Sequence, residues 1–250
     1  MKSIVITGAS SGIGNYCAHH FDQLGFRVFA TVRNASDAEK LKEEASNRLI
    51  PVMCDVTDAA MIEDMRRRIE IETEESGLAG LVNNAGIVCI APVEIVPIDA
   101  FRKQLEVNVV GTVAVTQTLL PLLRLGNGRV VNMSSTSGRM AWPMFGLYAA
   151  SKFAVEALSD ALRMELAPWG IHVSAIEPGS TATGIWSRSF AYRDQLLDTV
   201  PESSVGLYRQ FIQSACDMAA GAGKQGISPA YVARAVEHAL TSRRPKARYL

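Results

Sequence analysis

Residues 4–14 read IVITGASSGIG, and this stretch decides the fold. Its first three residues are apolar and β-branched, which is typical of a short strand buried on both faces. The glycine-rich turn that follows leads into a helical stretch over residues 12–24. Such an arrangement binds anions, because glycine lets the backbone approach a pyrophosphate and the helix N-terminus favours its charge. The spacing is G-x-x-x-G-x-G rather than G-x-G-x-x-G, and the alternative is a turn that only packs the strand on the helix.

Strand-like and helical stretches alternate along the chain. The predicted strands are residues 4–6, 28–31, 49–53, 80–82, 129–133 and 171–176, and the predicted helices are residues 12–24, 38–45, 59–74, 100–123 and 148–166. This alternation predicts a Rossmann-like α/β fold, a doubly wound parallel sheet in three α/β/α layers. Ligands of such sheets bind at the carboxyl ends of the strands. We expect one domain over residues 1–250, in which only residues 180–224 depart from the alternation.

Composition narrows the class of protein. The chain has 250 residues, and its 25 basic and 25 acidic residues give a net charge of zero, so we expect no nucleic-acid partner. Four cysteines and four histidines are scattered without metal-ligand spacing, which predicts no metal site and reduced thiols in a cytoplasmic protein. We expect no apolar stretch that approaches the length of a membrane span, and the first strand begins too early to leave room for a signal peptide.

Tyr148 and Lys152 are four residues apart in a predicted helix, a spacing that puts both side chains on one face. A nearby positive charge favours the phenolate and lowers the pKa of a tyrosine, which is ordinarily about 10. The pair is therefore a candidate acid–base site. Taken alone, it also fits a solvated helix face.

Several motifs in a fixed order give the chain a clear resemblance. They are Thr7-Gly8-x-x-x-Gly12-Ile13-Gly14, Asp55-Val56, Asn83-Asn84-Ala85-Gly86, Asn108, Ser135, Tyr148-x-x-x-Lys152 and Pro178-Gly179 with Thr183. Over essentially its whole length the chain resembles the single-domain short-chain dehydrogenases/reductases. The last residues, 247–250, fall where this family usually has its last strand and a short tail.

The resemblance implies four catalytic residues. Tyr148 would be the general acid for carbonyl reduction and the general base for alcohol oxidation. Ser135 would polarise the substrate oxygen; its neighbour Ser134 is the rival, and the family spacing to Tyr148 selects Ser135. Lys152 would hold the nicotinamide ribose and lower the Tyr148 pKa, and Asn108 would bind a water that joins Lys152 to solvent.

The resemblance also implies a nicotinamide cofactor and transfer of its pro-S hydride. The residues expected at the cofactor are Gly8, Ser10, Ser11, Gly12, Ile13, Gly14, Arg33, Asp55, Val56, Asn84, Ala85, Gly86, Tyr148, Lys152, Pro178, Gly179 and Thr183. Asp55 would meet the adenine, and the segment after Pro178 would set the nicotinamide face.

The end of the second strand favours NADP(H) over NAD(H). Enzymes that prefer NAD place a carboxylate there, on the ribose 2′-hydroxyl. Val32 occupies that position here, and the next residue, Arg33, carries a guanidinium suited to a phosphate. Against this, the serines at positions 10 and 11 supply no basic residue inside the glycine motif.

The substrate is expected to be a small hydrophobic ketone, aldehyde or alcohol. Residues 180–224 match the variable substrate lid of the family and are rich in apolar side chains, including Trp186. Residues 140–145, just before Tyr148, and residues 89–91 would add two more apolar walls. These segments resemble steroid and retinol dehydrogenases more than sugar-handling relatives.

Two other functions fit less well. A reductase of 3-oxoacyl thioesters on an acidic carrier protein would need a basic docking patch, for which Arg188, Arg193 and Arg209 are candidates. A non-catalytic NADP-binding regulator would have little reason to keep the serine, tyrosine and lysine. Relatives commonly form homodimers or homotetramers through the two long helices, here residues 100–123 and 148–166.

Overall fold

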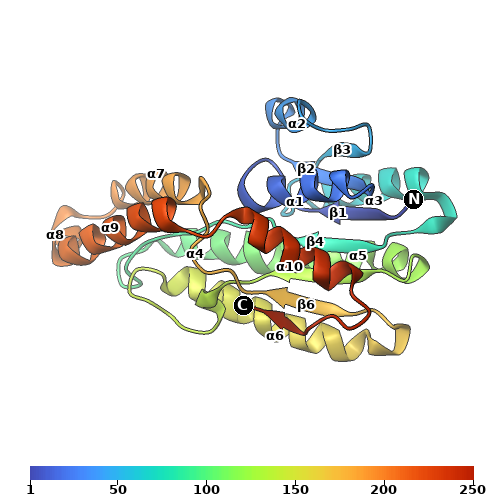
Figure 1. The fold of residues 1–250 in the computed structure, drawn as a ribbon. Coiled ribbons are helices and arrows are strands. Elements are labelled where there is room, and N and C mark those ends of the chain that lie inside the picture. The colour runs from blue at the N-terminus through green and yellow to red at the C-terminus, as the bar shows by residue number, and fades with distance from the viewer.

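In the computed structural model, seven parallel strands form one sheet in the order β3-β2-β1-β4-β5-β6-β7 (Figure 1). The structure describes the backbone of residues 1–250 and all side chains except those of residues 186, 187, 219, 220 and 222–225. The strands are β1 (Ser3–Ile6), β2 (Arg27–Val32), β3 (Leu49–Met53), β4 (Gly80–Asn83), β5 (Arg129–Met133), β6 (Val173–Ile176) and β7 (Arg248–Tyr249). The sheet is the predicted Rossmann-like, doubly wound sheet, which is therefore confirmed.

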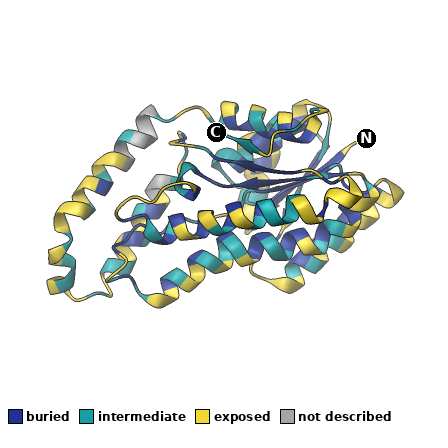
Figure 2. Cartoon of the chain, turned by 90° about the horizontal axis from the view of Figure 1, so that it is seen from below, coloured by how far each residue is buried: buried dark blue, intermediate teal, exposed yellow. Residues whose placement is uncertain are grey.

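Helices cover both faces of the sheet, because the strands are apolar on both sides (Figure 2). In β1, Ile4 and Ile6 pack toward one face and Val5 toward the other. The first face is covered by α1 (Gly12–Gln23), α2 (Ala35–Lys42) and α10 (Pro229–Thr241). The second is covered by α3 (Ala59–Thr73), α5 (Gly111–Leu125) and α6 (Gly146–Glu165). The layers are thus α/β/α.

Three elements differ from the sequence prediction. Helix α2 begins at Ala35 rather than residue 38, because the Asn34 side chain caps it by accepting from the backbone N–H of Asp37. Helix α10 was not predicted, although Ser228 caps it and Pro229 is its first residue. The predicted helix 100–123 is longer and is interrupted in the middle by a π-helix, η2 (Glu106–Val110), between α4 (Ile98–Leu105) and α5.

That helical run, Ile98–Leu125, is long and apolar enough to cross a membrane by length and composition alone, with a mean hydropathy of 1.3 in its most apolar window. The expectation that no apolar stretch approaches that length is wrong for this helix. Val115, Leu119 and Leu123 of the run are fully buried in the core against the sheet. A third of that window is buried, so core packing accounts for part of its apolar character.

The segment that departs from the alternation forms three helices, α7 (Ile185–Leu197), α8 (Glu202–Leu207) and α9 (Arg209–Gln225). They extend beyond the end of the sheet, at the left of Figure 1. An isolated bridge between Thr181 and Ile227 closes the base of this excursion. These helices lie in the predicted lid, residues 180–224, and Trp186 falls among the side chains outside the described ones.

Candidate active site

Three positions of the turn after β1 require glycine. Gly8 and Gly12 have φ values of +66° and +62°, which L-residues rarely adopt. A Cβ at Gly8 would lie 2.8 Å from the Cα of Ala85, and a Cβ at Gly14 would lie 2.3 Å from the Asn84 amide nitrogen. Gly14 therefore serves the packing of α1 on the turn. The turn itself stays open to a ligand at the N-terminus of α1.

Hydrogen bonds fix this turn to the end of β4. The Asn84 side chain donates to the carbonyl oxygens of Thr7 (2.9 Å) and Gly8 (3.0 Å). The Thr7 hydroxyl oxygen accepts from the backbone N–H groups of Asn84 and Ala85, both at 2.9 Å. The backbone N–H of Gly8 donates to the Thr31 hydroxyl at 3.0 Å. Thr31 was not among the predicted residues, because only the pairing of β1 with β2 brings it to the turn.

A cavity of about 510 Å³ opens at the carboxyl ends of the strands. Most predicted residues line it: Gly8, Ser10, Ser11, Gly12, Ile13, Arg33, Asp55, Val56, Asn84, Ala85, Gly86, Ser135, Tyr148, Lys152, Pro178, Gly179 and Thr183. Gly14 and Asn108 do not. The open turn, with Arg33 and Lys152 on the same cavity, fits an anionic dinucleotide.

One part of the cavity lies at the ends of β2 and β3. Val32 and Arg33 both line the cavity, but Val32 is 2% exposed and belongs to the core, whereas Arg33 is exposed. Burial raises the pKa of Asp55, but hydrogen bonds from Thr57 and the charges of Arg33 and Lys103 outweigh this and lower it. The guanidinium of Arg33 thus acts on the carboxylate that was predicted to meet the adenine. Lys103, which also lines the cavity, was not predicted.

Ser135, rather than Ser134, contacts Tyr148. The Ser135 side chain acts on the phenol of Tyr148 and lowers its pKa. The Ser135 hydroxyl also accepts from the backbone N–H of Ser137 at 3.1 Å. The Ser134 hydroxyl is buried without a hydrogen-bond partner among the described residues, and it lies against Gly138. The two serines face different ways because successive extended residues alternate.

Lys152 is 6% exposed, and its ammonium donates to the carbonyl oxygen of Met133 at 2.6 Å. Its nitrogen lies 5.6 Å from the centre of the Tyr148 ring. Burial lowers the pKa of Lys152 to about 8, and the charge of Glu156 opposes that change. Lys152 therefore carries its charge at neutral pH.

The pKa of Tyr148 is raised by burial, and the hydrogen bond with Ser135 offsets only part of this. The net direction is opposite to the lowering by Lys152 that the sequence predicts. Burial is the largest cause of the shift, and the Lys152 ammonium donates its hydrogen bond to the Met133 carbonyl. Tyr148 is thus protonated at neutral pH in this structure.

Asn108 lies in the π-helix η2 and is 1% exposed. Its side chain donates to the Ile87 carbonyl and to the Ser151 hydroxyl, both at 3.0 Å, and accepts from the Ile87 N–H at 2.9 Å. Ser151 in turn donates to the carbonyl of Tyr148 at 2.7 Å. Asn108 therefore ties η2 to the start of α6, and its expected link to Lys152 through a water stays a prediction.

The apolar part of the cavity differs from the predicted walls. Residues 89–91 are buried in the core and do not line it; Ile87 and Val88 do. Trp142 and Phe145 line it from the segment before α6, as expected, whereas Met140 does not. The lid adds Ile185, Arg188, Ser189, Tyr192 and Met218. Arg188 donates to the Ser11 hydroxyl at 2.7 Å, a contact across 177 residues that no sequence pattern signals.

The three arginines considered for a docking patch are each engaged by another side chain. Besides Arg188, Arg193 is largely buried and pairs with Asp194, and Arg209 pairs with Glu202. They do not form the open basic patch that a carrier-protein reductase would need.

Comparison with known proteins agrees with the site. The family model of short chain dehydrogenases matches residues 2–194. The chain is 37% identical to retinol dehydrogenase 5 of Mus musculus over 98% of its own length and 79% of that protein. It is also 37% identical to the NADPH-dependent 3-dehydrocapnine reductase of Ornithobacterium rhinotracheale, over 100% and 88% of the two chains.

A solved structure agrees as well. A short-chain dehydrogenase from Streptomyces avermitilis superposes with a TM-score of 0.79 at 29% identity, over 99% of this chain and 86% of that one. The glycine-rich turn, the Ser135–Tyr148–Lys152 cluster and these similarities lead to one assignment. The chain belongs to the short-chain dehydrogenase family of oxidoreductases.

Proposed function

We propose that this protein is an NADP(H)-dependent oxidoreductase that interconverts a hydrophobic ketone or aldehyde with its alcohol, on retinol- or steroid-like substrates. One observation carries the proposal above the others. Ser135, Tyr148 and Lys152 line one wall of the cavity, where the Ser135 side chain acts on the Tyr148 phenol and the Lys152 ammonium lies 5.6 Å from the centre of the Tyr148 ring.

In the proposed mechanism, the bound nicotinamide cofactor supplies or takes up the hydride. Ser135 donates a hydrogen bond to the substrate oxygen and orients it. Tyr148 gives its proton to that oxygen during reduction and takes it back during oxidation. Because its pKa is raised by burial, Tyr148 holds this proton at neutral pH. Lys152, still charged at pH 7, would hold the ribose hydroxyls of the cofactor.

Two observations support NADP(H) as the cofactor. Arg33 is exposed on the cavity wall, where its guanidinium can pair with a 2′-phosphate. Val32, at the position where NAD-dependent enzymes keep a carboxylate, is buried in the core and offers no acceptor to a ribose hydroxyl. One relative of the chain is described as NADPH-dependent.

The apolar wall supports a hydrophobic substrate. Ile87, Val88, Phe145, Ile185 and Met218 line the same cavity as Tyr148. An apolar pocket with few polar groups selects substrates by buried area and leaves orientation to those polar groups. One relative, whose similarity extends over 98% of this chain, is a retinol dehydrogenase.

Turnover with NADPH tests the proposal. The purified protein is assayed with a retinal, a steroid ketone and an acetoacetyl thioester, and the loss of NADPH absorbance is followed. We expect turnover of the retinal or the steroid ketone, and far less with Tyr148→Phe. Preference for the thioester would favour the carrier-protein reductase. No turnover with any of the three, while NADPH binds, would favour a regulator.

We also infer that a second copy of the chain covers the outer faces of the two long helical segments. Large apolar side chains are exposed there, namely Val110, Leu125, Phe153 and Met164. Analytical ultracentrifugation tests this, and a monomer at micromolar concentration would refute it.

A further inference from the structure

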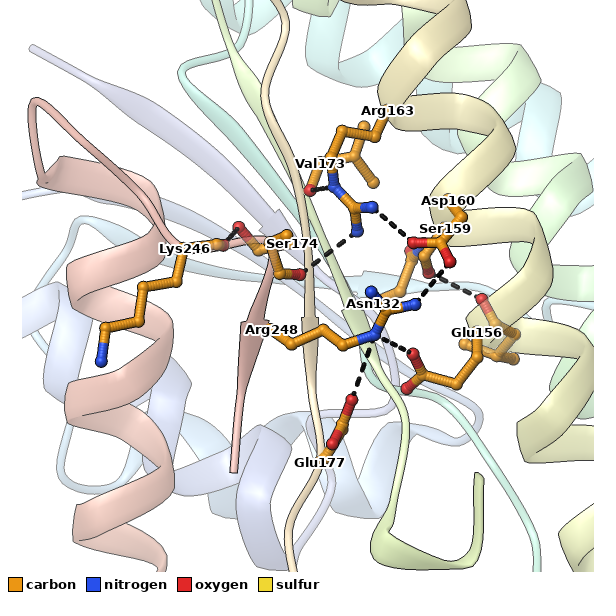
Figure 3. A network of polar contacts seen from close by, with 12 residues as sticks. Asn132, Glu156, Ser159, Asp160, Arg163, Val173, Ser174, Glu177, Lys246 and Arg248 are labelled. Atoms are coloured by element: carbon orange, nitrogen blue, oxygen red, sulfur yellow. Dashed lines mark hydrogen bonds and ion pairs between the residues drawn. The ribbon is translucent and has the colours of Figure 1, made fainter. Parts of the chain in front are cut away.

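Arg248 of the last strand, β7, connects three carboxylates near the active site (Figure 3). Its guanidinium is paired with Glu156 at 2.9 Å and with Asp160, both on α6, and with Glu177 at 3.4 Å. Glu177 follows β6 and immediately precedes Pro178, which lines the cavity. The catalytic helix and the segment after β6 are therefore held by one side chain.

Glu156 is the member of this cluster next to the active site. It lies four residues after Lys152 on α6, so the two side chains share a helix face. It is 7% exposed, and only one of its oxygens is engaged: Oε2 accepts from Nε of Arg248, while Oε1 has no hydrogen-bond partner among the described residues. The low dielectric of the interior screens a buried carboxylate only weakly. With one oxygen that accepts no hydrogen bond from a described residue, the carboxylate therefore interacts strongly with nearby charges.

We propose that Glu156 is a positioning residue that keeps the buried Lys152 ammonium charged, and that Arg248 holds Glu156 in place for this role. This inference rests on the proposed function, because it concerns the lysine of the same site. It gives β7 an indirect role in catalysis, because Arg248 of this strand holds Glu156.

The physical argument is a balance of two effects on Lys152. Burial removes water from the ammonium and favours its neutral form, whereas the Glu156 charge favours the ammonium. The result is a pKa of about 8, close enough to neutrality that a lost carboxylate changes the charged fraction under working conditions. Arg248 pairs with the Glu156 carboxylate at 2.9 Å, and this pairing offsets part of the cost of burying that side chain.

Several other titratable groups lie around Lys152 and Glu156. They are Tyr148 and Asp160 on α6, Arg139 after the 3₁₀ turn Thr136–Gly138, Glu177 after β6 and Arg248 on β7. Arg139 is paired with Glu177 at 2.8 Å, and Asp160 is also paired with Arg163. Among the charges of this cluster, Glu156 is the one that acts on Lys152.

The test is Glu156→Gln, which keeps the shape and a hydrogen-bond acceptor for Arg248 but removes the charge. The first readout is the titration midpoint of Lys152, followed by NMR on protein with ¹³C-labelled lysine and assigned by comparison with Lys152→Met. We expect the midpoint to fall from about 8 by about one pH unit. The second readout is the alkaline limb of kcat, which should move down by a similar amount because the charged form is lost at a lower pH.

Asp160→Asn is the matched control. Asp160 pairs with the same guanidinium from the same helix, one turn further along, and its side chain is 43% exposed. We expect it to leave the Lys152 midpoint unchanged. An equal shift in both variants would show that the effect comes from Arg248 and would overturn the role of Glu156.

An unchanged midpoint in folded Glu156→Gln would also overturn the proposal. Glu156→Asp keeps the charge but withdraws it by one methylene, so its midpoint should fall by less. If circular dichroism shows that Glu156→Gln is unfolded, Glu156→Asp is compared with wild type instead. An unchanged Lys152 midpoint in Glu156→Asp would then refute the inference. The NMR titration needs no turnover, so the inference is decided even if the wild-type protein reduces none of the substrates tried.

Discussion

Arg33→Ala is the change that best separates the two nicotinamide cofactors. Arg33 is exposed on the cavity wall at the end of β2 and acts on Asp55 across that end of the cavity. If it pairs with a 2′-phosphate, its removal deprives NADP of a charged partner. It also leaves Lys103 as the remaining positive charge that acts on the Asp55 carboxylate, so that this carboxylate repels the phosphate more strongly.

The size of the effect follows from the exposure of Arg33. Hydrogen bonds to charged groups contribute about 1.5–3 kcal/mol, and solvent screening of an exposed guanidinium favours the lower end of that range. At about 1.4 kcal/mol for each factor of ten, kcat/KM for NADP should fall about tenfold, or further where repulsion by Asp55 adds to the loss. A 2′-hydroxyl carries no charge, so kcat/KM for NAD should change little.

The measurement is the ratio of kcat/KM for NADP to that for NAD, in wild type, Arg33→Ala and Arg33→Lys. The lysine variant keeps the charge without the bidentate geometry and should lie in between. Arg67→Ala is the control, since Arg67 is 63% exposed on α3 and lies away from the cavity. Raising the ionic strength should reduce the wild-type ratio. An unchanged ratio in Arg33→Ala would refute the role of Arg33 and leave the NADP preference without support.

Three further changes test the rest of the site. Tyr148→Phe removes only the phenolic group, so steady-state turnover should fall by about 10²–10⁴-fold while NADPH binding, measured by fluorescence titration, persists; comparable turnover would refute the proton-donor role. Ser135→Ala should lower kcat about 100-fold, whereas Ser134→Ala, which removes a hydroxyl that has no hydrogen-bond partner among the described residues, should not, and the reverse result would reassign the serine. Gly14→Ala would place a Cβ 2.3 Å from the Asn84 amide, so urea denaturation should show a loss of about 1–3 kcal/mol, and unchanged stability would contradict the close packing at this turn.

The sequence predicts the sheet well because the signal for its strands is local. Buried parallel strands are short apolar runs, and β1 to β5 differ from their predicted bounds by no more than one residue at either end. Strand β7 has two residues, too few for any pattern; its place at the edge depends on pairing with β6. The local signal for α10 was present, in Ser228 and Pro229 before an apolar periodic run, and was missed.

The site was predictable as a set of residues but not as a set of contacts. A parallel sheet brings all strand ends to one edge, so motifs at those ends share a cavity whatever their separation in sequence. Which group each side chain meets depends on packing. Arg188 reaches Ser11 from a helix whose path no motif specifies. Residues 89–91 are buried in the core, and the neighbouring Ile87 and Val88 line the cavity instead.

Burial gives the candidate site its chemical character. It raises the pKa of Tyr148 and lowers that of Lys152, because a neutral phenol and a neutral amine both lose less than their ions when water is excluded. At neutral pH the phenol is thus kept protonated, as a proton donor to a carbonyl must be. The pKa of Lys152, about 8, lies only a little above neutral pH, so its ammonium stays charged by a small margin. That margin depends on the charge of Glu156. Sequence spacing identifies the tyrosine and the lysine as partners, but the carboxylate that balances burial is found only where α6 meets the last strand.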